Sequence, residues 1–186
     1  HACNLSCKYC FVQHKDALKM SLKTALSCVK REIEYSLGAG YKELLVTFMG
    51  GEPFLNFTVI KGDVEWLSRN KVEGLKVYAF ATTNGTILTQ EIKHWLVLYK
   101  DIFRVSVSYD GSPQMQAQNR TRIGVDLDFF ISEFPVQVVH MTVSKATLSN
   151  LADGVEWLLK RNARISLTLA YGQMWTDDDA LVYEQQ

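Results

Sequence analysis

Three cysteines lie close to the start of the chain, and their spacing suits an iron–sulfur cluster. Cys3, Cys7 and Cys10 form the pattern Cys-x3-Cys-x2-Cys. Thiolates are the ligands that hold the irons of a 4Fe-4S cube, which leaves one of its irons without a side-chain ligand when only three thiolates are offered. Such an iron has open coordination positions. The pattern therefore predicts a cluster that binds and activates a small molecule rather than one that only passes electrons.

Other uses of these cysteines fit the sequence less well. Three clustered thiols cannot pair among themselves without a remainder, and the other cysteine, Cys28, lies in an amphipathic helical pattern typical of a small core side chain. A structural zinc site normally takes four protein ligands. His1 could supply a fourth ligand, but the chain offers no second Cys-x2-Cys pair. The segment also departs from the bacterial ferredoxin pattern.

Composition narrows the class of protein. The 186 residues suffice for one domain with a sizeable core, which we expect to span residues 1–186. Lys plus Arg and Asp plus Glu both number 20, so no net charge attracts nucleic acid or an anionic membrane. The chain has no apolar run of membrane-spanning length and no signal peptide pattern. Reduced, cluster-binding thiols suit a reducing compartment, so we expect a cytoplasmic protein.

Apolar spacing alternates between helical and strand-like along the chain. Ser21, Asn56 and Thr89 are candidate N-caps for the first three helices. Helices are predicted over about 22–37, 57–69 and 90–99, from after residue 108 through 129–130, and over 151–159. Strands are predicted over 44–48, 75–82, 103–108, 136–143 and 165–171. Alternation of this kind predicts an α/β fold with a parallel sheet and right-handed crossovers.

Two of the predicted strands carry one polar face. Arg104, Ser106 and Ser108 alternate with apolar residues in the first of them. The last strand repeats this with Arg164, Ser166 and Thr168. A sheet covered by helices on both faces should be apolar on both. A closed barrel filled by side chains has branched apolar residues in its lumen. The pattern favours a barrel with a wet or ligand-filled lumen, and the alternative is a pair of strands near a sheet edge that face solvent.

Glycine-containing runs follow the carboxyl ends of successive predicted strands. Gly50-Gly51-Glu52-Pro53 follows the first, Thr83-Asn84-Gly85 the second and Asp110-Gly111 the third. Function in parallel α/β folds gathers at these strand ends, so we expect the runs to meet at one rim. Gly50 and Gly51 would let backbone carbonyls accept hydrogen bonds from a cationic amine. The alternative for each run is an ordinary turn.

The cysteine pattern together with these runs resembles the radical S-adenosylmethionine enzymes. Met49-Gly50-Gly51-Glu52-Pro53, Thr83-Asn84-Gly85 and Ser108-Tyr109-Asp110-Gly111 resemble in particular the SPASM-type, sulfatase-maturase-like branch, which modifies peptides and proteins. The resemblance covers most of the chain. It implies a partial (β/α)6 barrel with five strands visible and the first strand before residue 1. Because the chain starts at His1, we expect a core fragment trimmed at both ends.

The same resemblance implies the site. Cys3, Cys7 and Cys10 would hold a 4Fe-4S cluster, and S-adenosylmethionine would bind the fourth iron and be cleaved reductively to a 5′-deoxyadenosyl radical. No general base is needed for that step, so no catalytic side chain is assigned. The cofactor-binding residues implied are Tyr9, Gly50, Gly51, Glu52, Asn84, Ser108 and Arg120. The variant Gly51→Val is expected to spare the cluster and weaken cofactor binding.

Within this set the resemblance gives each residue a role. Gly50, Gly51 and Glu52 would lie at the methionyl amine, Asn84 would line the pocket, and Ser108 and Arg120 would bind the carboxylate, the last by a charge-assisted pair. Tyr9 would lie against the adenine. The alternatives are Arg122 for the arginine, a solvated surface position for Arg120, and a hydrophobic packing role for Phe11.

The resemblance also implies the partners. These are a peptide or protein substrate and an electron donor such as a flavodoxin or ferredoxin, with no nucleic acid and no membrane. The chain would then be an oxidoreductase that modifies peptides. Two alternatives are a radical enzyme acting on a small metabolite and a non-catalytic iron–sulfur binding module.

Overall fold

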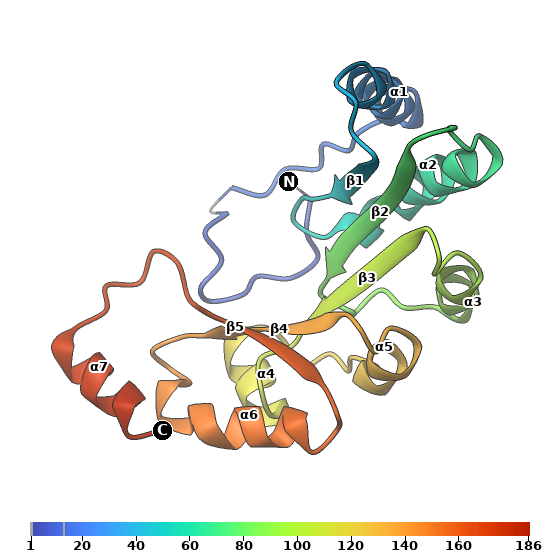
Figure 1. Cartoon of the computed structure of the whole chain (residues 1–186). Helices are drawn as coiled ribbons and strands as arrows, with labels where there is room; N and C mark the ends of the chain where they lie inside the picture. The colour runs from blue at the N-terminus through green and yellow to red at the C-terminus, as the bar shows by residue number, and fades with distance from the viewer. Residues whose placement is uncertain (1, 13) are drawn as a thin grey trace. The chain divides into compact units, whose positions relative to one another are not determined.

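The computed structural model describes residues 2–12 and 14–186 and has an α/β fold. Strands and helices alternate along the chain, which confirms the predicted fold class (Figure 1). The strands are β1 (Glu43–Phe48), β2 (Lys76–Thr83), β3 (Phe103–Ser108), β4 (Val138–Val143) and β5 (Arg164–Leu169). The helices are α1 (Leu22–Gly38), α2 (Phe57–Arg69), α3 (Gln90–Leu98), α4 (Pro113–Asn119), α5 (Leu127–Glu133), α6 (Leu151–Leu159) and α7 (Asp177–Glu184), with 3-10 turns η1 (Pro53–Asn56) and η2 (Leu148–Asn150). Within the described part of the chain, no helix is both long and apolar enough to span a bilayer.

The chain divides into two compact units that interleave along the sequence. Unit 1 comprises His1–Cys3, Lys15–Thr83 and Ile87–Val105. Unit 2 comprises Asn4–His14, Asn84–Thr86 and Ser106–Gln186. The cysteine segment is therefore shared, with Cys3 in unit 1 and Cys7 and Cys10 in unit 2.

Parallel strand pairing runs through both units. In unit 1, β1 pairs with β2 along its whole length, and the Ala79 N–H donates to the Ile102 carbonyl at 2.8 Å just before β3. In unit 2, the end of β3 pairs with β4, and β4 pairs with β5. The strands follow one another in the order β1-β2-β3-β4-β5. Neighbours in sequence are thus neighbours in the sheet, as parallel strands with helical crossovers require.

Aromatic side chains form the core of unit 1. The Trp95 ring of α3 packs edge-on against Phe57 of α2, with ring centroids 5.0 Å apart, and tilted against Phe103 of β3 at 5.5 Å. Phe103 is fully buried. Burial of each such ring stabilises the fold by about 1.5–3 kcal/mol. This packing fixes the start of β3 and therefore the strand whose far end carries Ser108.

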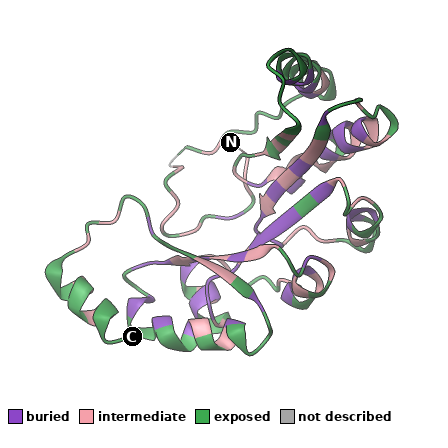
Figure 2. Ribbon diagram, viewed as in Figure 1, coloured by how far each residue is buried: buried purple, intermediate pink, exposed green. Residues whose placement is uncertain are grey.

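In unit 2 the core lies between β4 and the helices. Val139, Met141 and Val143 alternate along β4 and are buried, as the purple segments of Figure 2 show for this part of the sheet. Met115 of α4 packs against Gly154 of α6, where an added Cβ would lie 2.6 Å from the Met115 Sδ. Glycine at this position therefore lets α4 and α6 approach closely.

The other face of β3 and β5 is polar, as predicted, and His140 and Thr142 place polar side chains on the same face of β4. Ser108 lies opposite His140, and His140 lies opposite Ser166, so the three side chains form a row on one face of the sheet. All three are half-buried. Burial lowers the pKa of His140, so its imidazole is neutral near pH 7. The row is therefore a set of uncharged hydrogen-bonding groups.

All three predicted N-cap residues occupy the N-cap positions of their helices, and two of them cap through the side chain. The Ser21 hydroxyl accepts the Thr24 N–H at 3.1 Å, and the Thr89 hydroxyl accepts the Ile92 N–H at 3.2 Å. Asn56 makes no side-chain cap hydrogen bond. Its side-chain amide instead donates to the Met20 carbonyl at 2.9 Å, which ties the approach to α1 to the start of α2.

One carboxyl group is buried in unit 1 without a hydrogen-bond donor. Asp63 of α2 is 1% exposed, and neither of its side-chain oxygens has a partner among the described residues. Burial raises the pKa of this carboxyl from 3.8 to about 6. Because the folded-state pKa exceeds the unfolded one, folding favours the protonated form. The free energy of unfolding should therefore fall as the pH rises from about 4 through about 6.

Asp63→Asn is expected to raise the free energy of unfolding at pH 8 by about 1–3 kcal/mol and to change it little at pH 4, since an amide has no charge to bury. Urea unfolding of both proteins at the two pH values measures this. Asp153→Asn, which alters an exposed carboxylate of α6, is the control. An equal effect at both pH values would contradict the burial cost assigned to Asp63.

Candidate functional site

The second and third cysteines bracket a tight turn in unit 2. The Cys10 N–H donates to the Cys7 carbonyl at 3.0 Å, which makes Lys8 and Tyr9 the two central residues of a β-turn. Both cysteines are half-buried and neither forms a disulfide. The turn thus holds two thiols in one short segment, as two ligands of one cluster require.

Both central residues of this turn are held by the segment that follows β3. The Lys8 N–H donates to the Asn119 carbonyl at 2.9 Å, at the last residue of α4. The Tyr9 hydroxyl donates to the Asp110 carboxylate at 2.7 Å. The Arg120 guanidinium donates to the same hydroxyl at 2.8 Å. The cysteine turn is therefore attached to the carboxyl end of β3 and to the end of α4.

Asp110 is the centre of these contacts. Its carboxylate is fully buried and also accepts the Thr142 N–H at 3.0 Å and the Asn119 amide at 3.3 Å. Arg120 lies 3.7 Å from it. Burial raises the pKa of Asp110, and the Arg120 charge and the donated hydrogen bonds oppose that rise. These contacts are the kind that a buried carboxyl group needs.

The charges around Tyr9 keep the network in one protonation pattern. Burial raises the pKa of the Tyr9 phenol, so its hydroxyl keeps its proton and donates. Burial opposes the charge of Arg120, but Tyr9, Asp110 and Cys7 outweigh it and hold its pKa above the usual value. Arg120 is therefore a permanent positive charge beside the turn.

Asn119 connects the network to the loop after β4. Its amide donates to the Thr147 hydroxyl at 3.2 Å, and its side-chain oxygen accepts the Ser144 hydroxyl at 2.7 Å. Asn119, Ser144 and Thr147 are all buried. Satisfied polar networks of this kind hold a single conformation, so the surroundings of the turn are rigid.

In unit 1 the glycine run approaches the first cysteine. A Cβ added to Gly51 would lie 2.5 Å from the Ala2 carbonyl oxygen and 2.7 Å from the Cys3 Cβ, closer than real side chains come. The Glu52 N–H donates to the Ala2 carbonyl at 2.9 Å. Gly50, by contrast, has no heavy atom within 4 Å of its added Cβ. Gly51 is therefore required for the fit of the Cys3 backbone.

Glu52 has an internal structural role. Its buried carboxylate accepts the Phe54 N–H at 2.9 Å and the Thr83 hydroxyl at 2.7 Å. These bonds cap η1 and join the end of β1 to the end of β2. They stabilise the loop that contacts Ala2 and Cys3.

Asn84 and Gly85 hold a further part of the cysteine segment within unit 2. The Asn84 amide donates to the Asn4 side chain at 2.9 Å, and the Asn4 amide donates to the Thr86 hydroxyl at 2.8 Å. Gly85 has a positive φ of 73°, and an added Cβ would lie 2.6 Å from Val125. The turn alternative is thus partly right, because this is a glycine turn that also binds the segment between Cys3 and Cys7.

The predicted site residues are therefore divided between the two units. Cys3 and the Gly50–Glu52 run belong to unit 1, and the remaining predicted residues belong to unit 2: Tyr9, Cys7, Cys10, Asn84, Ser108 and Arg120. Within residues 2–12 and 14–186, no three Cys, His, Asp or Glu side chains form a metal-binding group. His1, considered above as a zinc ligand, lies outside the described residues. The assignment of the metal ligands stays a prediction.

Residues 1–124 match the family described as the 4Fe-4S single cluster domain. The chain belongs to this family, and with its relatives to the radical S-adenosylmethionine enzymes. The match includes every predicted site residue, which confirms the family expected from the cysteine pattern. It supports a 4Fe-4S cluster as the metal group of this chain.

Three curated relatives match parts of the chain. An uncharacterized protein of Methanocaldococcus jannaschii is 34% identical over 110 residues, which cover 59% of this chain and 35% of that protein. The radical SAM cyclopropyl synthase TigE of Paramaledivibacter caminithermalis is 29% identical, covering 59% of this chain and 25% of the synthase. A serine-type anaerobic sulfatase-maturating enzyme of Klebsiella aerogenes is 27% identical, covering 64% and 29%. The matches thus span about a third or less of these relatives.

Solved structures confirm the fold. Native anSMEcpe with bound AdoMet and Kp18Cys peptide superimposes with a TM-score of 0.78 at 20% sequence identity, covering 98% of this chain and 55% of that one. This similarity extends over nearly the whole chain. The α/β arrangement is therefore that of the radical SAM enzymes, a partial barrel.

Two local features fit the groups that this family uses. The Cys7–Cys10 turn offers soft thiolate ligands beside the positive charge of Arg120, which suits an anionic iron–sulfur cluster. The Nε of Arg120 is buried and has no acceptor among the described residues. A carboxylate ligand would satisfy it. Of the two arginines considered, Arg120 has this environment, whereas Arg122 is exposed.

Sequence reasoning missed the residues that hold the cysteine segment. Asp110 was noted only as part of a motif and Asn119 was given no role, yet their hydrogen bonds hold the turn. The sequence did offer one signal for Asp110. A carboxylate in an Asp-Gly pair at the end of a buried strand needs hydrogen-bond donors nearby. Phe11, considered for hydrophobic packing, is 75% exposed, and its ring lies edge-on to Tyr171 with ring centroids 6.5 Å apart.

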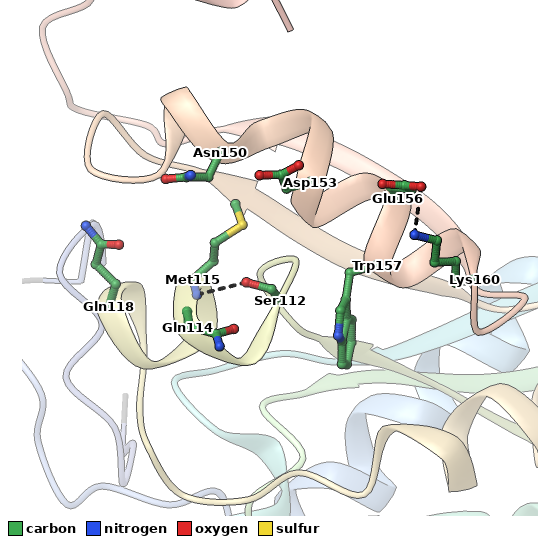
Figure 3. A pocket seen from close by; sticks show the side chains of 9 residues that line it. All are labelled: Ser112, Gln114, Met115, Gln118, Asn150, Asp153, Glu156, Trp157 and Lys160. Carbon is green, nitrogen blue, oxygen red and sulfur yellow. Dashed lines mark hydrogen bonds and ion pairs between the residues drawn. The ribbon is translucent and has the colours of Figure 1, made fainter.

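A separate hollow of about 450 Å³ lies between α4 and α6 (Figure 3). Its lining includes Glu156, whose carboxylate is paired with Lys160 at 2.7 Å. The Trp157 ring stacks on the Tyr109 ring, and the Cζ of Arg161 lies 3.5 Å from the Trp157 ring centroid. The hollow contains none of the predicted site residues.

Proposed function

We propose that this chain is the core of a radical S-adenosylmethionine enzyme in which Cys3, Cys7 and Cys10 bind a 4Fe-4S cluster. Membership of the 4Fe-4S single cluster family is the observation that carries the proposal. Local geometry supports it, because each motif run contacts the cysteine segment: Glu52 contacts Ala2, Asn84 contacts Asn4, and Asp110 contacts Tyr9. When bound, the cluster supplies the electron for reductive cleavage of S-adenosylmethionine.

The chain's own residues would bind and orient the cofactor. The backbone of Gly50 and Gly51 would accept hydrogen bonds from the methionyl amine, with Glu52 holding the loop in place. Ser108 would donate to the carboxylate, and the buried Nε of Arg120 would add a charge-assisted bond. These groups supply position and exclude water, and no side chain is required as a general base.

Asn84 and Tyr9 complete the proposed cofactor site. Asn84 would line it while keeping its bond to Asn4. Tyr9 would present its ring to the adenine, with its hydroxyl already used by Asp110 and Arg120. In this proposal the ring and the hydroxyl of Tyr9 have separate roles, since one faces a ligand and the other holds the turn.

A peptide or protein is the substrate class that we favour. One relative is a sulfatase-maturating enzyme, and the superimposed anSMEcpe structure holds a peptide. His140 and Ser166, the members of the row that the cofactor would not use, support this choice, because uncharged hydrogen-bonding groups suit peptide amides. An electron donor such as a flavodoxin or ferredoxin would reduce the cluster. Reduced thiols also favour a cytoplasmic location.

Anaerobic reconstitution of the full-length protein with iron and sulfide tests this proposal. With a reductant and S-adenosylmethionine, the protein should form 5′-deoxyadenosine, measured by liquid chromatography. Substrate identity can be tested separately by adding peptides encoded beside the gene, which should accelerate product formation. A loaded cluster that never yields 5′-deoxyadenosine would contradict the enzyme proposal and favour a binding module. Acceleration by a small metabolite but by no peptide would contradict the substrate class.

A further inference from the structure

We propose that Asp110 and Asn119 are positioning residues that fix the Cys7–Cys10 turn for cluster binding. The inference rests on the proposed function, because it assigns a role around the same cluster. It adds two residues that bind neither iron nor cofactor. Their role is to hold the loop that carries two of the three thiolate ligands.

The two anchors act at the two central positions of the turn. Lys8 is held through its backbone by the Asn119 carbonyl at 2.9 Å, and Tyr9 through its hydroxyl by the Asp110 carboxylate at 2.7 Å. Residues at these positions set the direction of the flanking residues, here Cys7 and Cys10. Two independent bonds therefore define the orientation of both thiols.

The anchors themselves are rigid. Asp110 is 0% exposed and Asn119 1% exposed, and the two side chains bond to each other at 3.3 Å. Thr142 and Ser144, in and after β4, complete their hydrogen bonds. The turn is thus attached to a fully buried part of unit 2 rather than to a surface loop. Because the turn is already fixed, the chain loses less conformational entropy when it binds the cluster.

Charge gives Asp110 a second effect. Its carboxylate lies 3.7 Å from Arg120, which is also near Cys7. Replacing the carboxylate by an amide leaves the arginine charge uncompensated beside the cluster. Added positive charge stabilises the reduced, more negative cluster, so the reduction potential should become more positive. A purely structural role for Asp110 would not produce this shift.

Three variants of the full-length protein test the inference. Tyr9→Phe removes only the hydroxyl that links the turn to Asp110, and Asp110→Asn removes the charge. Asp153→Asn, at an exposed acid of the same unit, is the control. After anaerobic reconstitution, iron loss to a chelator and the reduction potential are measured, with thermal unfolding as a check of the fold.

We expect iron loss on the order of 10- to 100-fold faster in Tyr9→Phe and Asp110→Asn, with a more positive potential in Asp110→Asn. Asp153→Asn should match the wild type. If Asp110→Asn does not fold, the chelator result for Tyr9→Phe decides. Folded variants with wild-type iron retention and potential would overturn the inference while leaving the proposed function intact. A wild-type protein that binds no iron would overturn both.

Discussion

Cys7→Ala is expected to reduce cluster iron to background and to abolish 5′-deoxyadenosine formation. The remaining two thiolates would leave two irons of the cube without protein ligands, so the cluster would be labile. Iron and sulfide per chain, with the absorbance of the reconstituted protein, measure the loss. The effect should be large because thiolate bonds are the attachment of the cluster to the chain.

Cys28→Ala is the matched control. The sequence led us to expect a small core side chain at Cys28, but the structure shows an exposed thiol of α1, and no role is proposed for it. It should load iron as the wild type does. Cys3→Ala and Cys10→Ala should behave as Cys7→Ala does. A fully loaded and active Cys7→Ala protein would contradict the assignment of the ligands.

Gly51→Val is expected to weaken S-adenosylmethionine binding and also to disturb the cluster. From the sequence alone the cluster was expected to be spared. The structure revises this, because a Cβ at Gly51 would lie 2.5 Å from the Ala2 carbonyl and 2.7 Å from the Cys3 Cβ. Those atoms are at or next to the backbone, so the start of the cysteine segment must move. We expect at least about a tenfold loss in cofactor affinity, together with reduced iron content.

Gly38→Val is the control for this variant, since Gly38 has no proposed role and its added Cβ meets open space. Isothermal titration with S-adenosylmethionine and iron analysis of both proteins separate the two effects. Normal iron content and normal affinity in Gly51→Val would show that the contact with Cys3 is unimportant. Loss of S-adenosylmethionine affinity with normal iron content would agree with the expectation from the sequence, in which the cluster is spared.

Local patterns in the sequence predicted the elements that depend on local physics. The spacing of apolar residues predicted the five strands and the polar face that carries Ser108 and Ser166. The chemistry of helix caps predicted Ser21 and Thr89. One helix was predicted between β3 and Phe130, where the structure has two short helices, α4 and α5. The short helix α7 was not predicted, because it has no long apolar period. Asn56 occupies the predicted N-cap position without a side-chain cap bond, and nothing in the sequence indicated that its amide would donate to the Met20 carbonyl.

The motif residues of the candidate site could be named from the sequence, whereas the residues that support the cysteine segment could not. The assignment of the metal ligands stays a prediction. Cysteine spacing is visible in the sequence, whereas the bond between Tyr9 and Asp110 joins residues 101 positions apart. No periodicity encodes such a pair. Glu52 and Asn84 show the same limit, because their side chains were expected at a cofactor and the structure gives both of them internal partners. The motifs identified these residues in the sequence. Their hydrogen-bond partners could be found only from the folded structure.

The central claim is that one iron of the cluster has no side-chain ligand and is bound by the amine and carboxylate of S-adenosylmethionine. Electron–nuclear double resonance of the reduced protein with cofactor labelled with 15N in the amine or 17O in the carboxylate tests it most directly. The account predicts hyperfine coupling from both labels to the cluster. A cluster spectrum that is identical with and without the cofactor, with no coupling from either label, would contradict it.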